Sequence, residues 1–433
     1  MIEQHAATVN GSARGAARPA LQARRPEVRP SPAPSRPLRV LLLNERCHQN
    51  PLAGGAETHL FEIFGRLAMR GVRTELLCCG FDGAASSVEH RGVAISRIGT
   101  RFSFYAHVAG EVRRRVASGE VDLIVEALNK VPFLSPLYSR RVPVLVIHHH
   151  LHGWTAFRQV PPWLALPSVA LEALVPLVYR RVPFLTISAS SKTDLVHRGV
   201  PEEHIDVVPC GIDHNLYRPG VPDGRAPPVV TLGRLEPYKR VDLLLRAWRR
   251  VVADVPARLV IIGRGQEEAR LRALAARLGI ADDVNFAGFV SEADKVGWLQ
   301  HAVLLVQCSV REGWGLTVSE AGACGTPVVA TDVPGLTDSV QDGVTGLLVR
   351  RARPGPLAAA IRKLLADVET RQRMSRRALA WSAYFDWDES ASAVLHAIRR
   401  AVRPAAVPVA VPHVAVKHLV GAAVLASDSG GSP

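Results

Sequence analysis

The sequence has 433 residues, a length that suits two domains of about 150 to 200 residues better than a single domain. Hydrophobic residues make up 48% of the chain and aromatic residues only 6%, which favours a globular α/β protein over a β-sandwich or a disordered chain. The formal net charge of +14 favours anionic partners, such as nucleic acid, phosphorylated small molecules or an acidic membrane surface.

Residues 1–37 are predicted to form a disordered basic arm, because six Arg and two Glu stand among many Ala, Pro and Ser. The arm is rich in Arg like an organelle transit peptide, but proline breaks it and it is poorly amphipathic. The six cysteines lack Cys-x-x-Cys spacing, and no uncharged apolar run reaches about 20 residues. A cytoplasmic protein without a spanning helix or secretory signal is therefore expected.

Residues 38–218 are predicted to form the first domain. It starts with "LRVLLLNERC", a strand buried on both faces, and continues with a glycine turn, a helix over "GGAETHLFEIFGRLAMRG" and a second strand, "VRTELLCCG". Three more apolar runs end in polar residues: "VDLIVEA", "VPVLVIHHH" and "PFLTISASS". Strands of open α/β sheets present functional loops at their carboxyl ends in this way.

Residues 219–385 are predicted to form the second domain, after a break rich in Gly and Pro. Its expected strands are "VVTLGR", "ARLVIIGRG", "DVNFAGFV", "AVLLVQCS", "TPVVATD" and "TGLLV", and a helix is expected at about 356–368. Residues 386–403 are predicted to form a helix that crosses back to the first domain. The Ala/Val-rich tail, 404–433, is broken by proline, and both flexibility and weak membrane contact remain open.

Two loops at strand ends have the composition of an anion site. Gly54 and Gly55 separate the first strand from the first helix, where backbone N–H groups can approach a phosphate, although a tight connection would also explain them. Arg234 and Lys239 follow the first strand of the second domain. Two cations on one loop can bind a diphosphate and offset the charge that develops as it leaves, and a surface-exposed basic turn is the alternative.

A pair of carboxylates, Glu312 and Glu320, flanks a Gly-Trp-Gly turn in the loop and helix after "AVLLVQCS". Carboxylates bind paired sugar or ribose hydroxyls well, whereas two helix-surface glutamates would be the structural alternative. Gly313 and Gly315 count against that alternative. Glycine lowers helix stability, so two glycines are expected here only if the backbone must approach a ligand closely.

Histidines gather at the end of one strand of the first domain: His148, His149, His150 and His152. A contiguous run of histidines converges poorly on one tetrahedral zinc centre, and no Cys or Glu accompanies it at ligand spacing, so no metal site is expected. One histidine that points into the cleft, for hydrogen bonding or acid–base chemistry, and histidines that are merely packed are both open.

Taken together, the motifs resemble the family 4 retaining glycosyltransferases, the "glycosyl transferases group 1" type with the GT-B fold. The resemblance runs from about Arg39 to Arg400. It is carried by the strand-end histidines, "GGAE" at 54–57, "PCGID" at 209–213, "GRLEPYKRVD" at 233–242, "GRGQEEARL" at 263–271, "GFV" at 288–290 and "EGWGLTVSEAGACGTPVVATDVPG" at 312–335. The last motif is the most specific.

This resemblance implies an α/β protein with two Rossmann-like doubly wound domains facing a cleft. It implies transfer of a hexose from a UDP- or GDP-sugar with retention, without a cofactor or an obligatory metal. The implied catalytic residues are Glu312, His149, His150, Arg234 and Lys239. The implied donor-binding residues are Gly54, Gly55, Arg234, Lys239, Gly263, Phe289, Val290, Glu312, Gly313, Trp314, Gly315, Leu316 and Glu320. Glu312 would hold sugar hydroxyls and Glu320 the ribose.

Three positions depart from the common family pattern and leave the donor open: Arg240 follows Lys239 in place of Gly, Asp338 replaces Glu, and Trp314 replaces Phe. The segments "VEALNKVPFLSPLY" and "HHHLHGW" look like a bacterial subgroup that builds cell-surface polysaccharides or glycolipids. The apolar segment "PPWLALPSVALEALVPLVYRR" ends in Arg180 and Arg181 and predicts either docking on an anionic membrane or an ordinary buried helix. Docking would imply a lipid-linked acceptor.

The rival functions are a nucleotide-sugar epimerase, a phosphorylase, and a non-catalytic carbohydrate-binding or scaffold protein with the same fold. The presence of Arg234, Lys239, Glu312 and Glu320 together argues against lost catalysis. Nucleic-acid binding would use the positive charge, but no basic strand interleaved with aromatics is present. Nucleic acid is therefore not an expected partner.

Overall fold

The structure is a computed structural model that describes residues 36–129, 131–151, 153, 157, 162–221 and 226–402, without the side chain of Leu164. The predicted arm, apart from its last two residues, and the predicted tail lie outside these ranges, as does His152.

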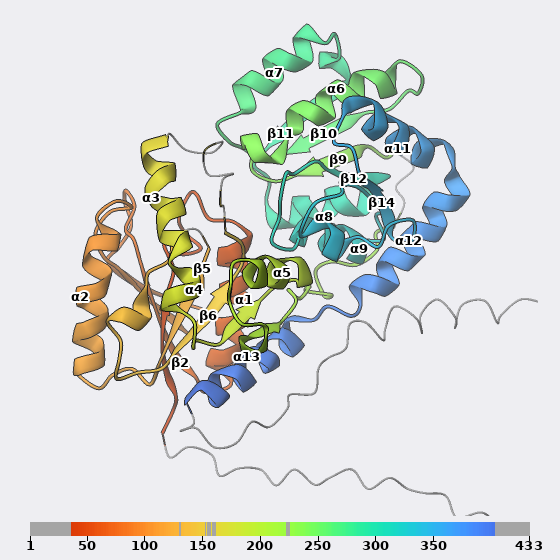
Figure 1. The fold of residues 1–433 in the computed structure, drawn as a ribbon. Coiled ribbons are helices and arrows are strands. Elements are labelled where there is room, and N and C mark those ends of the chain that lie inside the picture. Colours follow the sequence, from red (N-terminus) through yellow and green to blue (C-terminus); the bar gives the residue numbers. More distant parts are fainter. Residues whose placement is uncertain are drawn as a thin grey trace, which may run out of the picture. The chain divides into compact units, whose positions relative to one another are not determined.

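Within the described residues, the strands form two sheets (Figure 1). The larger sheet contains β1 (Arg39–Leu43), β2 (Arg73–Cys78), β3 (Ser87–His90), β4 (Val93–Arg97), β5 (Leu123–Leu128), β6 (Val144–His148), β7 (Phe184–Thr186) and β8 (Ile205–Val207). The smaller sheet contains β9 (Val229–Leu232), β10 (Leu259–Ile262), β11 (Val284–Gly288), β12 (Leu304–Gln307), β13 (Val328–Thr331) and β14 (Gly346–Val349).

Helices connect most of the parallel strands, as the alternating pattern predicts. The first domain contains α1 (Gly55–Met69), α2 (Phe104–Ala117), α3 (Pro162–Ala173), α4 (Val175–Val178) and α5 (Ala189–His197). The second contains α6 (Val241–Val252), α7 (Glu268–Arg277), α8 (Glu292–His301), α9 (Leu316–Ala323), α10 (Leu336–Ser339), α11 (Pro354–Ala366) and α12 (Val368–Ser382), followed by α13 (Trp387–Val402). Among the short 3-10 helices, η4 (Pro237–Lys239) lies in the loop after β9.

The strand orders confirm the two predicted doubly wound domains. The smaller sheet runs β11-β10-β9-β12-β13-β14 and is parallel throughout, so its order reverses between β9 and β12. The larger sheet runs β3-β4-β2-β1-β5-β6-β7-β8 and reverses between β1 and β5. Ligands of such sheets bind outside the carboxyl ends of the strands at the point of reversal. The loops after β1, β5, β9 and β12 are therefore the expected binding loops.

The sequence analysis did not identify the antiparallel edge of the larger sheet. Strands β3 and β4 form a hairpin in which Glu89 lies opposite Ala94, and β4 then pairs in parallel with β2. Every residue of β3 is at least partly exposed, because β3 is the edge strand and has a neighbour on one side only. A short half-exposed strand lacks the continuous apolar run that marks the buried strands, so its pattern is weak.

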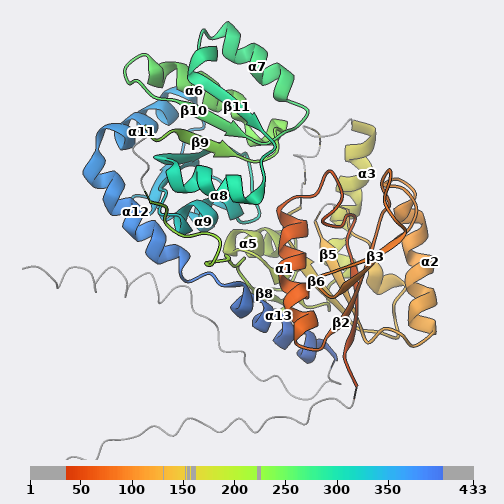
Figure 2. The same cartoon turned by 180° about the vertical axis from the view of Figure 1, so that it is seen from behind.

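Helix α13 returns to the first domain and packs against α1, as both views of the fold show (Figures 1 and 2). Its buried residues, among them Trp387, Ala391, Val394 and Ile398, recur at helical spacing and join the core around β5 and β6. The domain limits at residues 218 and 385 stay predictions.

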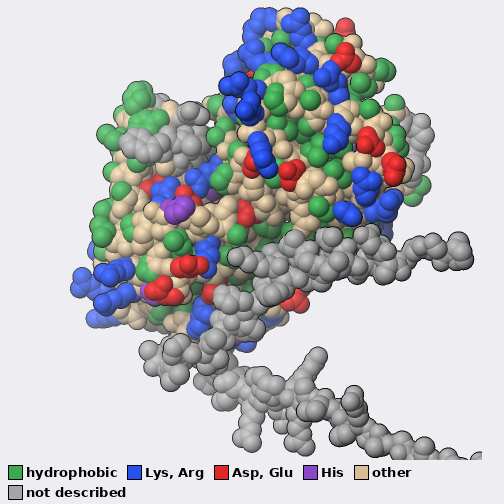
Figure 3. Space-filling view, turned by 45° about the vertical axis from the view of Figure 1, so that its right-hand side comes forward, with side chains coloured by type: hydrophobic (Ala, Val, Ile, Leu, Met, Phe, Trp, Pro, Cys, Tyr) green, Lys and Arg blue, Asp and Glu red, His purple; other side chains and the backbone are tan. Residues whose placement is uncertain are grey.

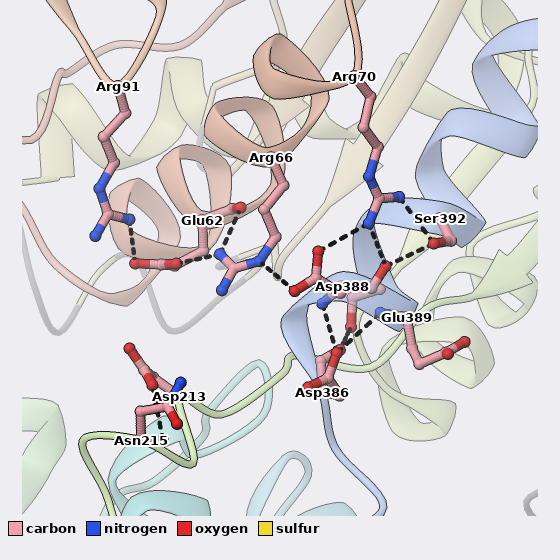
Figure 4. A network of polar contacts seen from close by, with 11 residues as sticks. Glu62, Arg66, Arg70, Arg91, Asp213, Asn215, Asp386, Asp388, Glu389 and Ser392 are labelled. Atoms are coloured by element: carbon pink, nitrogen blue, oxygen red, sulfur yellow. Dashed lines mark hydrogen bonds and ion pairs between the residues drawn. The ribbon is translucent and has the colours of Figure 1, made fainter.

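Polar contacts connect the outer faces of α1 and α13 (Figure 4). The guanidinium of Arg70 contacts the carboxylate of Asp388 at 2.8 Å and donates to Ser392 Oγ at 2.8 Å, and Arg66 Nε lies 3.4 Å from the same carboxylate. Glu62, one turn before Arg66, pairs with both Arg66 and Arg91. Exposed ion pairs contribute little free energy, so the buried apolar side chains hold α13 in place and these contacts set its register.

Candidate functional site

A cleft of about 850 Å³ is lined by loops from both domains, a volume within the range of small-molecule sites. Its walls include the loops after β1, β5, β6, β9 and β12. Among the predicted site residues, those that line the cleft are Gly54, Gly55, His149, His150, Arg234, Lys239, Phe289, Glu312, Gly313, Trp314, Gly315 and Leu316. Gly263, Val290 and Glu320 are not in the wall.

The two predicted cations occupy the loop after β9, the strand at the point of reversal. Lys239 ends η4, and its ammonium lies 2.5 Å from Glu312 Oε1 and 5.3 Å from the centre of the Tyr238 ring. Burial lowers the pKa of Lys239, but the neighbouring Glu312 carboxylate raises it by more than burial lowers it. The pKa of Lys239 therefore lies above its usual value. In the described part of the chain no carboxylate pairs with Arg234, so its charge is available to an anion.

Glu312 is fixed by the loop that follows β12. Its backbone N–H donates to the carbonyl of Pro334 at 3.0 Å, and its Oε1 accepts from both Ser309 Oγ and Lys239 Nζ. The loop is tied to the cation loop by the Val310 N–H, which donates to the Tyr238 carbonyl at 2.8 Å. The carboxylate and the two cations therefore belong to one connected pair of loops.

The Gly-Trp-Gly turn meets the first domain directly. A Cβ on Gly313 would lie 2.9 Å from the backbone oxygen of His149 and 2.9 Å from Ile187, so only glycine fits this contact between the domains. Gly315 precedes α9 with a φ of 96°, in the left-handed region. The Trp314 ring is buried against Phe385, with 5.0 Å between ring centres.

Glu320 lies on α9 behind the cleft wall and is held by a lysine that the sequence analysis missed. Lys295 Nζ, from α8, donates to Glu320 Oε1 at 3.2 Å, and Lys295 itself lines the cleft. Glu320 Oε2 is buried without a hydrogen-bond partner in the described residues. Burial raises the pKa of Glu320, while Lys295 opposes that rise. Buried acceptors without a partner are uncommon in folded proteins, so Oε2 is the oxygen of Glu320 with capacity for a further hydrogen bond.

The strand-end histidines point to different partners. His149 Nε2 lies 3.2 Å from Nδ1 of His59 on α1, and His148 Nδ1 lies 3.4 Å from Thr186 Oγ1. Burial lowers the pKa of His149 well below its usual value and that of His59 to about 4, so both are neutral at physiological pH. His150 lines the cleft. Within the described residues no group of three or more His, Cys, Asp and Glu is arranged to hold a metal ion.

The glycines of the first loop begin α1. The Gly54 N–H donates to Glu57 Oε2 at 2.7 Å, which caps the helix, and the Arg234 Nε would lie 3.9 Å from a Cβ on Gly54. A Cβ on Gly55 would lie 3.3 Å from Leu316 of the second domain. The two glycines thus let the first helix approach the cation loop, although the Gly54 N–H is already bound.

The remaining predicted residues differ in environment. Phe289 lines the cleft and is 76% exposed, whereas Val290 packs against the core. Gly263 packs directly against Gly233 at the start of the loop that carries Arg234 and Lys239, because a Cβ on Gly263 would lie 2.0 Å from the Gly233 carbonyl oxygen.

Several cleft residues were not predicted from the sequence. Polar examples are Glu57, Tyr238, Gln266, Lys295, Gln307 and Thr317. Tyr238 lies within the quoted motif at 233–242 and Gln266 within the one at 263–271, so both were within reach of sequence reasoning. Lys295 belongs to a helix whose pattern carries no binding signal, so only the packing of α8 beside α9 reveals it.

Two family descriptions match the chain. "Glycosyltransferase Family 4" matches residues 53–216 and "Glycosyl transferases group 1" matches residues 218–381. A D-inositol 3-phosphate glycosyltransferase from Thermobispora bispora is 32% identical over 80% of this chain and 91% of its own length. A D-inositol 3-phosphate glycosyltransferase from Acidothermus cellulolyticus is 38% identical over 46% of this chain. That alignment spans about half (49%) of the relative's own length.

Solved structures show the same fold. Sucrose-phosphate synthase from Thermosynechococcus elongatus has a TM-score of 0.71 and 22% identity, over 84% of this chain and 98% of its own. HepE from Anabaena, in complex with UDP and glucose, has a TM-score of 0.69 and 21% identity, over 84% and 100%. These likenesses confirm the predicted GT-B fold.

Proposed function

Because the chain belongs to the glycosyltransferases of group 1 and family 4, we propose that it moves a hexose from a nucleotide-sugar to an acceptor hydroxyl with retention of configuration. The observation that carries the proposal is the arrangement of Arg234, Lys239 and Glu312 in one cleft. It supplies two cations for a diphosphate and a carboxylate for sugar hydroxyls. HepE, with UDP and glucose bound, supports a UDP-sugar as the first donor to test, beside GDP-sugars.

In the proposed reaction the bond between the sugar C1 and the diphosphate oxygen breaks, and the electron pair stays with the diphosphate. The acceptor oxygen bonds to C1 on the face from which the diphosphate leaves, and its proton passes to the departing oxygen. Arg234 and Lys239 stabilise the charge that develops there, the role of preorganised donors in such sites. His149 and His150 line the same cleft and are the histidines proposed to flank the sugar.

Glu312 and Glu320 bind rather than transfer protons in this proposal. Glu312 orients the transferred sugar through its hydroxyls, and the unpaired Oε2 of Glu320 accepts from the ribose. Phe289, which is exposed and lines the cleft, would contact the base. No metal is obligatory, because the two cations offset the diphosphate. Unchanged turnover in the presence of a chelator is expected, and loss of turnover that Mg²⁺ restores would contradict this part.

The acceptor is proposed to be a glycan or a lipid-linked sugar in cell-surface polysaccharide or glycolipid synthesis, with the enzyme in the cytoplasm at the inner face of the membrane. No helix in the described residues is both long and apolar enough to cross a bilayer. The relatives named as D-inositol 3-phosphate glycosyltransferases make inositol phosphate the small acceptor to test beside it.

The decisive experiment is a donor panel of UDP- and GDP-hexoses, with release of nucleoside diphosphate as the readout. Lys239→Ala and Glu312→Ala should each lower turnover about 100-fold, the effect of removing one charged group from such a site. Glu369→Ala and Lys363→Ala, exposed on α12 and α11, are matched controls and should turn over normally. Equal turnover by the wild type and both site variants would refute the site. Product NMR then gives the anomeric configuration.

A further inference from the structure

Helices α3 and α4 expose apolar side chains along their whole length. Trp163, Leu166, Leu174 and Leu177 are all exposed, Trp163 and Leu177 each to 73%. Leu174 keeps helical backbone angles between the two helices, so the helical direction continues. With the exposed Ala170, these side chains recur every three or four residues and form one stripe about 21 Å long. We call these five residues the apolar stripe.

The one charged residue of this segment points inward. Between Pro162 and Val178 the sequence contains a single charged side chain, Glu172, and it is 1% exposed. Its Oε2 accepts from the Gly153 N–H at 2.8 Å and lies 3.3 Å from Nη1 of Arg198, the residue that follows α5. A surface helix of a soluble protein normally presents charge to water and apolar groups to the core. Here the only charge faces inward beside buried apolar residues, and the outer face carries none, so the outer face is suited to an apolar medium.

Four arginines lie near one end of the stripe. Arg140 and Arg141 precede β6, and Arg180 and Arg181 precede β7. β6 and β7 are parallel neighbours with Val146 opposite Phe184, so both pairs lie at the amino edge of the sheet. All four are exposed, and within the described residues none forms an ion pair with a carboxylate. Figure 3 shows one face of the molecule, on which Lys and Arg side chains gather at the lower left and apolar side chains lie exposed at the upper left. We call the four the arginine quartet.

The same helix reaches the cleft. Ser168 of α3 lines it, and so do the exposed apolar side chains of Phe102 and Leu52. A molecule anchored in an apolar layer under the stripe would therefore bring its polar head to the cleft. The arginine quartet lies away from this mouth, at the opposite edge of the sheet.

We propose that the apolar stripe inserts into the surface of a bilayer that contains anionic lipids, while the arginine quartet contacts the lipid headgroups. Interfacial helices combine an apolar face that bears Trp and Leu with nearby basic groups, and each basic side chain strengthens binding to anionic lipid. The docking stands on the surface alone. Its consequence, delivery of a lipid-linked acceptor to the cleft, rests on the proposed function.

Charge favours a bilayer over a second copy of the chain. In a two-fold dimer the same patch meets itself, so two unpaired arginine quartets would approach the same interface. Like charges oppose that arrangement, whereas anionic headgroups neutralise it. The bilayer is therefore the occupant that satisfies both the stripe and the quartet.

The test is co-sedimentation of the full chain with vesicles of phosphatidylcholine alone and of phosphatidylcholine with phosphatidylglycerol. Binding is expected only with the anionic lipid and should weaken with salt. Trp163→Ser with Leu177→Ser, and separately Arg180→Glu with Arg181→Glu, should each weaken binding at least about tenfold. Val221→Ser and Arg249→Glu with Arg250→Glu, exposed elsewhere, are matched controls and should bind as the wild type does.

Circular dichroism and the unfolding temperature check that each variant is folded, and donor hydrolysis without vesicles should be unchanged in the stripe variants. Wild-type binding by both folded double variants would overturn the docking surface, whatever the donor panel shows. A dimer in sedimentation equilibrium that Leu177→Ser dissociates would also overturn it, in favour of a second copy. Loss of hydrolysis in Glu312→Ala with normal vesicle binding would leave docking and catalysis as separate findings.

Discussion

Lys239 and Glu312, which the sequence assigns to different parts of the donor, are bound to each other: Nζ and Oε1 lie 2.5 Å apart in the cleft. The carboxylate keeps a partly buried ammonium charged, since burial alone lowers the pKa of Lys239 and Glu312 raises it. The ion pair thus forms before a donor enters, and the ammonium is held charged for the diphosphate.

Glu312→Gln should therefore make anion binding depend on pH. Without the carboxylate, burial dominates and the pKa of Lys239 falls, so the ammonium loses its proton at a lower pH than in the wild type. Affinity for nucleoside diphosphate, measured by calorimetry, should decline in the variant as pH rises towards 10.5, before the wild type declines. Lys239→Met should bind weakly at every pH. Identical pH profiles for Glu312→Gln and the wild type would show that the pair does not maintain the charge.

Gly313→Ala should weaken the contact between the domains. The added methyl would lie 2.9 Å from both the His149 carbonyl oxygen and Ile187, and overpacking of this kind destabilises by about 1 to 3 kcal/mol. We expect a lower unfolding temperature and a raised KM for the donor. Gly297→Ala, inside α8 with no atom within 4 Å of the added methyl, is the control and should neither lower the unfolding temperature nor raise the KM. Normal values for Gly313→Ala would mean that the loop moves aside freely.

His59 should make stability depend on pH. Its folded pKa is about 4 and its usual value is 6.5, so the unfolded chain binds more protons between these values. The free energy of unfolding should accordingly fall as pH drops through 6.5 towards 4, and this histidine contributes about 3 kcal/mol to the fall. In His59→Asn, whose amide N–H can still donate to His149, that contribution should be absent. The same pH slope in denaturant titrations of both proteins would exclude it.

Glu320 should discriminate ribose from deoxyribose. If its unpaired Oε2 accepts from the ribose, the wild type should bind UDP about tenfold more tightly than the deoxyribose form, the difference of one charge-assisted hydrogen bond. Glu320→Ala should bind the two nucleotides equally. Thr370→Ala on α12, far along the chain from the cleft loops, serves as the control. A preference for ribose that persists in Glu320→Ala would place the ribose elsewhere.

Most of the fold could be predicted from the local pattern of residues along the chain. Continuous apolar runs identify parallel strands because such strands are buried on both faces, and this marks β1, β5 and β9 directly. The loop glycines and cations after β1 and β9 were found in the same way, since function in such sheets gathers at strand ends. The β3–β4 hairpin was missed because an edge strand has no such run.

The order of the elements and the kinds of side chain at their ends thus follow from the local pattern of residues. Which of those side chains meet depends on how the elements pack. Lys239 reaches Glu312 and Lys295 reaches Glu320 because separate loops and helices pack together, and no spacing along the chain encodes those distances. The direction of Glu172 was likewise hidden, because the sequence shows one carboxylate in an apolar helix but not that it pairs with Arg198, just after α5, while the leucines face outward.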